Sequence, residues 1–158
     1  ERVDDDTCPQ PSDAQGQVLL NMETLWQQAY PSECVIVRPT GIYGTSVSRM
    51  IKLAETTKSY PKLHWSNRIH IDDLVAFLAH LLHVEHTEKS YICSNSQPLP
   101  LHEIIQWFQQ QLGFPTLVLE SDVSSGKQIH ATRMQQMNFE LQHPHCFDDY
   151  LVLLEKRE

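Results

Sequence analysis

The sequence is poor in basic residues, and it contains no long apolar run. Its 158 residues include 12 Lys and Arg against 20 Asp and Glu, which gives a net charge of −8. Phosphate backbones are bound by clustered Lys and Arg, so this balance argues against nucleic acid as the main partner. No apolar segment approaches the roughly 18 residues that a membrane span needs. We therefore expect neither a nucleic-acid partner nor a membrane partner.

Several chemical signatures are also missing. Five glycines leave no Gly-x-Gly-x-x-Gly phosphate loop, and there is no Gly-x-Ser-x-Gly nucleophile motif. The four cysteines stand singly, without a Cys-x-x-Cys pair, which favours a reducing compartment and predicts a cytoplasmic protein. Histidines gather at 80–86 and 143–145, but neither group has the spacing of a metal signature. We expect no metal site.

The pattern of apolar residues predicts the fold class. A length of 158 residues suits one domain with its own core. Three-to-four spacing predicts helices over 13–28, 47–55, 72–82, 101–112, 133–137 and 147–154. Extended runs predict strands at 34–37, 64–71, 90–93 and 116–119, whereas 1–12, 40–46 and 58–61 are expected to be loops or turns. Strands that alternate with helices indicate an α/β fold with parallel pairing.

The segment that follows the strand at 34–37 is a candidate pocket wall. It reads Arg38-Pro39-Thr40-Gly41, and Tyr43 comes shortly after. In open α/β sheets, ligands bind outside the carboxyl ends of the strands. We interpret Arg38 as an anchor and Tyr43 as a lid or a stacking surface. The alternative is a structural turn with a buried tyrosine.

A second candidate lies in the extended run 64–71. Alternation puts Arg68 and His70 on one face of this run, and Asp72 is predicted to be the N-cap of the next helix. Arg68 and His70 either face a cleft, where they would hold an anionic group of a substrate or cofactor, or pair with Asp73 and join two elements. The sequence leaves both interpretations open.

Three ordered blocks resemble a known family. The blocks are 38–44, 67–74, and 91–94 with 100–104. In order and spacing they are similar to the C-terminal half of extended short-chain dehydrogenases/reductases, the NAD-dependent epimerase/dehydratase or nucleoside-diphosphate-sugar epimerase proteins. The resemblance implies the last parallel strands of a Rossmann-type sheet plus a small substrate-binding lobe. Residues 1–158 would form one domain. The N-terminal dinucleotide-binding half would be absent. The acidic first residues, which contain no apolar strand, suggest the same expectation.

The resemblance implies roles for particular residues. The loop at 39–43 would border the nicotinamide and the substrate, and residues 68–73 would support the cleft. The residues expected to bind substrate or cofactor are Arg38, Pro39, Thr40, Gly41, Tyr43, Arg68 and His70. The complete protein would use NAD or NADP, which this chain alone would bind weakly or not at all. Its expected partner is a small-molecule substrate, with a sugar nucleotide as the candidate.

The sequence departs from the family at the catalytic dyad. Counting back from Glu23, the family's Tyr and Lys positions are occupied by Gln15 and Leu19, and the usual Asn of the Arg-Pro-x-Asn loop is Gly41. Gln cannot supply a phenolic acid or base, and Leu cannot hold a ribose.

Two classes of function therefore stay open. The chain is either part of an atypical NAD(P)-dependent epimerase, dehydratase or reductase, or part of a non-catalytic protein of the same fold. An enzyme would rely on Arg38, Tyr43, Arg68 and His70. A non-catalytic protein would bind NAD(P) for regulation, or would serve as a structural interaction domain that forms homo-oligomers through an exposed sheet edge.

Overall fold

The computed structural model describes residues 1–156 as six helices and ten short strands. The helices are α1 (Ala14–Ala29), α2 (Ser48–Thr56), α3 (Ile71–Leu81), α4 (Leu101–Leu112), α5 (Thr132–Gln136) and α6 (Cys146–Glu155). The strands are β1 (Arg2–Val3), β2 (Ile36–Pro39), β3 (Gly41–Tyr43), β4 (Ser59–Tyr60), β5 (Trp65–Ser66), β6 (Arg68–His70), β7 (Ser90–Cys93), β8 (Leu99–Pro100), β9 (Val118–Leu119) and β10 (Gln128–Ile129). None of the helices within residues 1–156 is long and apolar enough to cross a membrane.

Parallel pairs dominate the strand topology. β2 pairs with β7, β3 with β6, β1 with β10 and β4 with β9, all in parallel, whereas β5 and β8 are antiparallel. The longest pair is β2·β7, in register from Ile36 opposite Ser90 to Pro39 opposite Cys93. The predicted α/β class with parallel pairing is confirmed.

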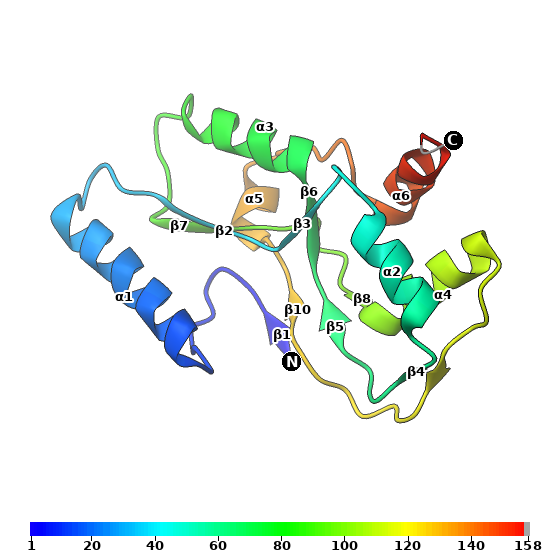
Figure 1. The fold of residues 1–158 in the computed structure, drawn as a ribbon. Coiled ribbons are helices and arrows are strands. Elements are labelled where there is room, and N and C mark those ends of the chain that lie inside the picture. Colours follow the sequence, from blue (N-terminus) through cyan, green and yellow to red (C-terminus); the bar gives the residue numbers. More distant parts are fainter. Residues whose placement is uncertain (157–158) are drawn as a thin grey trace.

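The apolar side chains form two cores. The helices around the first core, α2, α4 and α6, lie together on the right of Figure 1. Helices α2, α4 and α6 enclose the first core, around Phe108, Ile104 and Tyr150. The second core lies at β6, β7, α3 and α5, around Ile69 and Phe77. The segment 138–145 runs from the second core to the first and contributes Leu141 to the second. This segment therefore links the two cores.

Helix predictions that depend on local signals are confirmed. α4 begins and ends at the predicted residues, and Gly113 terminates it in the left-handed conformation, with a φ of 70°. α1 starts one residue after its N-cap Asp13, whose side chain accepts a hydrogen bond from Gly16 N at 2.7 Å. The helix at 72–82 is present as α3, but its N-cap is His70 rather than Asp72. The imidazole accepts a hydrogen bond from the Asp72 backbone N–H, so the helix begins one residue earlier.

The three segments predicted as loops each contain a short strand, which corrects the prediction. Residues 1–12 include β1, 40–46 include β3, and 58–61 include β4. Each is only two or three residues long and exists because a distant segment pairs with it. The first segment is also held by Asp5, a buried carboxylate that accepts from the backbone N–H groups of Ile92 and Arg133. Such long-range partners leave no periodic signal in the sequence.

Candidate functional site

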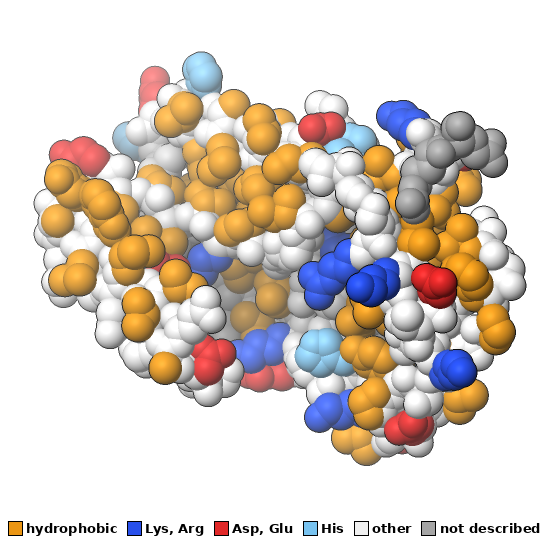
Figure 2. Space-filling view, viewed as in Figure 1, with side chains coloured by type: hydrophobic (Ala, Val, Ile, Leu, Met, Phe, Trp, Pro, Cys, Tyr) orange, Lys and Arg blue, Asp and Glu red, His pale blue; other side chains and the backbone are white. Residues whose placement is uncertain are grey.

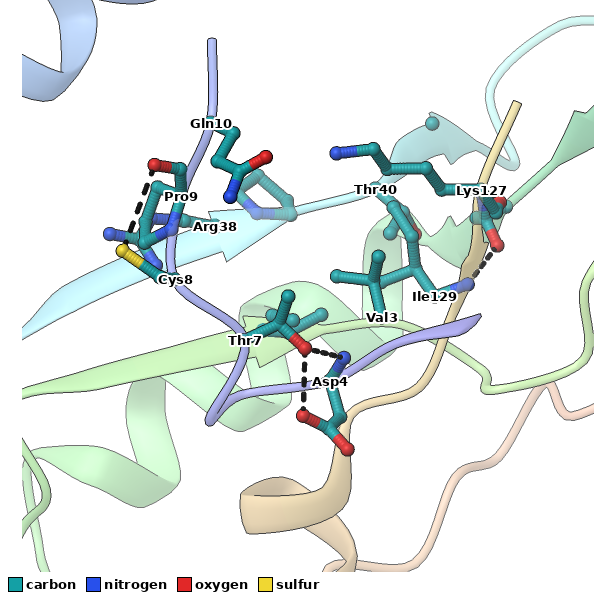
Figure 3. Close-up of a pocket in the computed structure, with 14 residues that line it drawn as sticks. Val3, Asp4, Thr7, Cys8, Pro9, Gln10, Arg38, Thr40, Lys127 and Ile129 are labelled. Atoms are coloured by element: carbon teal, nitrogen blue, oxygen red, sulfur yellow. Dashed lines mark hydrogen bonds between the residues drawn. The ribbon is translucent and has the colours of Figure 1, made fainter. Parts of the chain in front are cut away.

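Two cavities lie on either side of the loop that joins β2 to β3. The first, of about 330 Å³, is lined by the N-terminal segment 3–10, by residues 38–41 and by parts of β7 and β10 (Figure 3). The second, of about 290 Å³, is lined by residues 41–43, by the start of α2 and by residues 66–68. Gly41 and Asn67 line both cavities, so the loop is a shared wall.

The first cavity has apolar walls with a few polar groups at its edge. Val3, Ile92 and Ile129 contribute apolar surface. Arg38 lies on one side of it, and Lys127 lies on the other (Figure 3). A small number of polar groups around an apolar hollow is typical of a site for a small organic molecule.

Gly41 is required by the close approach of two strands. Its N–H donates to the carbonyl oxygen of Asn67 at 3.0 Å, and a Cβ added at position 41 would lie 2.9 Å from the same oxygen. Because that atom belongs to the backbone, any larger residue would push β3 away from β6. The Gly41 noted above as a departure from the resembled family is therefore explained by the local packing.

Arg38 lines the first cavity and forms an ion pair with Glu23 of α1. Its Nε donates to both carboxylate oxygens at 3.1 Å, and its Nη2 donates to Oε2 at 2.6 Å. This bidentate pair joins α1 to β2, and the carboxylate compensates the charge of the guanidinium. Arg38 thus joins α1 to β2, and its role as an anchor for a ligand stays a prediction.

The second cavity carries two basic side chains, Arg49 and Arg68. Arg49 is exposed at the start of α2. Arg68 is half-buried, donates from Nε to the hydroxyl of Tyr150 at 2.8 Å, and donates from Nη1 to the hydroxyl of Ser66. Its guanidinium is therefore held in place with neutral partners, which leaves its positive charge available to an anion. The alternative pairing of Arg68 or His70 with Asp73 is not observed.

Tyr43 lines the second cavity but does not present a reactive phenol to it. Its hydroxyl donates to Asp149 Oδ2 at 2.6 Å. Burial raises the pKa of Tyr43 above its ordinary value, and the neighbouring Asp149 carboxylate raises the pKa further. A phenol that is held this firmly in its protonated form is unsuited to accept and return a proton. Tyr43 is thus part of the wall of the second cavity.

His70 lines neither cavity. It is 6% exposed, its ring meets Tyr43 edge-on, and it stacks on His143 with ring centroids 3.7 Å apart. Gly44, at a φ of 115°, closes over it, and a Cβ there would lie 2.3 Å from His70 Nε2. Among the residues predicted to bind substrate or cofactor, Arg38, Pro39, Thr40 and Gly41 line the first cavity, and Gly41, Tyr43 and Arg68 line the second.

The two positions that the resemblance assigns to the catalytic dyad lie outside both cavities. Gln15 and Leu19 are exposed on α1, and neither is a lining residue of either cavity. The sequence analysis does not predict the role of Asn67 in the shared wall, nor the contacts of Asp149 with Tyr43 and of His143 with His70 beside it. Asn67 donates to Lys127 O and accepts from Ile129 N, so it joins the shared wall to β10. No signal in the sequence identifies these contacts, because each spans many residues.

We predict that protein stability falls below about pH 6.5 because of His70. Burial lowers the pKa of His70, and the adjacent His143 lowers it further. Above about pH 6.5 the imidazole is neutral in both the folded and the unfolded state. Below that pH the unfolded state takes up the proton first, so the free energy of unfolding decreases by up to about 1.4 kcal/mol per pH unit until the folded pKa is reached. Urea unfolding between pH 8 and pH 5 measures this slope.

His70→Asn is the control for this prediction, because Asn keeps an acceptor for the Asp72 N–H. The variant should show a shallower loss of stability over the same range. Equal slopes in the two proteins would mean that another group causes the pH dependence.

Comparison with solved structures finds proteins that share the fold of this chain. A protein from Methylobacillus flagellatus, described as an NAD-dependent epimerase/dehydratase, is 34% identical and superposes with a TM-score of 0.87. The match covers 100% of this chain and 59% of that protein. No family model matches the sequence, and no curated protein matches it.

More distant matches share the fold. The dTDP-glucose 4,6-dehydratase from Bacillus anthracis, solved with NAD, is 15% identical with a TM-score of 0.76, and the match covers 100% of this chain and 57% of that one. A human epimerase family protein, solved with NADPH, is 17% identical with a TM-score of 0.68, and the match covers 92% and 56%. The chain thus spans less than two thirds of the length of each of these proteins.

Proposed function

Because the chain belongs to the NAD-dependent epimerase/dehydratase family, we propose that it is the C-terminal, substrate-binding part of an NAD(P)-linked protein. The observation that carries this proposal is the pair of cavities that share the wall at Gly41, at the carboxyl end of β2. In a Rossmann-type sheet this end of the strands receives the ligand. Together the two cavities suit a cofactor ring and a substrate that meet across one loop.

The first cavity is the candidate for the nicotinamide end of the cofactor. Its apolar surface fits an aromatic ring, and Lys127 at its edge offers a positive charge to a phosphate or amide oxygen. Within residues 1–156 no glycine-rich phosphate loop is present, so this chain alone would hold the dinucleotide weakly or not at all. The remaining contacts would come from another part of the complete protein.

The second cavity is the candidate substrate site. Arg49 and Arg68 supply two positive charges beside the hydroxyls of Ser46 and Ser66, a combination that suits the phosphates of a sugar nucleotide. The B. anthracis relative is named for a substrate of this class. Whether the complete protein reacts with such a ligand or only binds it depends on residues that replace the dyad.

The exposed apolar face of α1 supports the proposal that a further part of the protein packs here. This helix has no fully buried residue, and hydrophobic side chains follow it on the left of Figure 2. The exposed ones are Val18, Leu19, Met22, Leu25 and Trp26. In our proposal the N-terminal half covers this face. A second copy of the chain is the other possible occupant, although the sequence analysis predicts that homo-oligomers form through a sheet edge. Four free thiols are consistent with the cytoplasmic location proposed for the protein.

A non-catalytic, cofactor-binding protein is the second candidate. The observation that favours it is the exposure of Gln15 and Leu19 on α1, away from both cavities, at the positions that the resemblance assigns to the dyad. Such a protein would bind NAD(P) and the small molecule without turnover. Absorbance at 340 nm during incubation of the complete protein with NAD(P) and candidate sugar nucleotides would separate an oxidoreductase from this alternative, and product analysis would detect an epimerase or dehydratase.

A thermal-shift titration with NAD⁺ and NADP⁺ tests the cofactor proposal. The complete protein should gain about 2.7 kcal/mol of stability at a ligand concentration 100 times the dissociation constant, whereas this chain alone should gain little. Cys8→Trp, which fills the first cavity, should abolish the gain. Ser12→Trp, exposed and outside the cavity, is the matched control. The absence of any shift in the complete protein would refute cofactor binding.

Titration with UDP tests the substrate site separately. Arg49→Ala should weaken UDP binding by about tenfold, because one charge-assisted hydrogen bond is lost. Lys52→Ala removes an equally exposed charge from the same helix outside the cavity and should leave the affinity unchanged. Equal effects of the two substitutions would mean that UDP affinity depends on the overall positive charge of this helix and not on the cavity.

A further inference from the structure

A cluster of metal-ligating side chains lies apart from both cavities. His70 ends β6, Asp72 follows in the first turn of α3, and His143 comes from the segment that links the two cores. Asp72 Oδ2 lies 3.7 Å from His70 Nδ1 and 3.8 Å from His143 Nε2. These three atoms all lie within 4.8 Å of one another. We propose that His70, Asp72 and His143 bind a divalent transition-metal ion of the zinc type.

The donor set suits zinc better than magnesium or calcium. Two imidazole nitrogens and one carboxylate are common zinc ligands, whereas magnesium and calcium prefer oxygen alone. Bonds of about 2.0–2.2 Å in a tetrahedron place neighbouring ligand atoms about 3.4 Å apart. The two distances to Asp72 exceed this value by only a few tenths of an ångström. Asp72 is 70% exposed, which leaves room for water as the fourth ligand.

Binding requires a limited movement of the His143 side chain. The two rings are stacked with an angle of 15° between their planes, so the lone pairs of their ligand nitrogens lie in two nearly parallel planes and do not yet converge on one point. Because the His143 side chain is 26% exposed, its ring has space to tilt toward Asp72, whereas the buried His70 stays in place. The ion would displace the 3.2 Å hydrogen bond from Asp72 N to His70 Nδ1. That N–H lies in the first turn of an exposed helix end, where water takes over as its acceptor.

A second carboxylate orients the His143 ring for this role. Asp149 Oδ1 lies 2.6 Å from His143 Nδ1, and its other oxygen accepts from Tyr43. A proton on Nδ1 in this hydrogen bond leaves the lone pair on Nε2, the nitrogen that faces Asp72. Carboxylate–histidine–metal arrangements of this kind are usual around zinc.

The main chain of His143 is fixed as well. The buried Asp73 carboxylate accepts from the N–H groups of Gln142 and His143. An ion held at this point would tie the linking segment to the end of β6 and thus join the two cores. The expectation of no metal considered only histidines close together in the sequence, whereas these ligands meet through the fold.

Calorimetric titration with ZnCl₂ tests the proposal in a Cys8→Ser background, which removes an exposed thiol that would compete for zinc. One zinc ion per chain should bind, and MgCl₂ should produce no binding heat. His143→Ala should weaken zinc binding at least tenfold, and Asp149→Asn should weaken it by about 10–100-fold through the loss of orientation. His145→Ala, an exposed histidine two residues away, is the matched control and should leave the affinity unchanged.

Asp72→Ala tests the proposed zinc site if His143→Ala proves unstable, because Asp72 is largely exposed and its removal should preserve the fold. A tenfold or greater loss of zinc affinity in Asp72→Ala supports the site. Unchanged affinity in this variant, or equal affinities in His143→Ala and His145→Ala, would overturn the proposal. The measurement involves neither cofactor nor substrate, so it is independent of the proposed function.

Discussion

Replacing Gln109 with alanine is expected to lower the free energy of unfolding by about 4 kcal/mol, because it removes three hydrogen bonds, two of them buried, and leaves a cavity. Gln109 is 0% exposed in the last turn of α4. Its Nε2 donates to the carbonyl oxygens of Ala54 and Thr57 at 3.0 and 2.8 Å. Its Oε1 accepts from Leu117 N at 2.8 Å. One side chain thus fixes the end of α2 and the segment before β9 to α4.

Urea unfolding, followed by tryptophan fluorescence, measures this loss. Gln110→Ala is the matched control, since it makes the same substitution at the next position of the helix, where the side chain is exposed. It should change the free energy of unfolding by less than about 0.5 kcal/mol. A loss below about 1 kcal/mol in Gln109→Ala would mean that water satisfies the freed backbone groups and that the side chain is not a structural link.

Local signals explain why the helices are predictable from the sequence. The boundaries of α4 follow from its apolar spacing and from Gly113, and the start of α1 follows from Asp13. Each of these signals lies within one or two helical turns of the boundary that it determines. Strands β1, β4 and β10 carry no such signal, because two residues form a strand only when a distant partner pairs with them.

The candidate site is predictable to a similar degree. The rule that ligands bind at the carboxyl ends of strands identifies residues 38–41, and these residues do line a cavity. The alternation in the sequence predicts Arg68 and His70 on one face, yet the two side chains have different surroundings. Arg68 reaches the second cavity, whereas His70 stacks on His143. That stacking partner comes from a segment more than seventy residues away, and no local pattern can indicate it.

Replacing Asp73 with alanine is expected to destabilise the protein by about 3 kcal/mol, because two partly buried N–H groups lose a charged acceptor. Asp73 is 1% exposed, and its two oxygens accept from Gln142 N at 2.8 Å and from His143 N at 3.0 Å. The carboxylate therefore holds the segment between the two cores against the first turn of α3. Asp73→Asn keeps one acceptor oxygen and should lose about half as much stability.

Asp72→Ala separates this backbone link from the general effect of a negative charge at a helix N-terminus. Asp72 is the neighbouring residue of the same turn but is 70% exposed, so its removal should cost no more than about 1 kcal/mol. Hydrogen exchange of the amides of residues 142 and 143 supplies a second readout. In Asp73→Ala these amides should exchange faster, because their acceptor is gone, whereas in Asp72→Ala they should stay protected. Equal protection in both variants would show that the segment is held by the packing of Leu141 instead of by the Asp73 carboxylate.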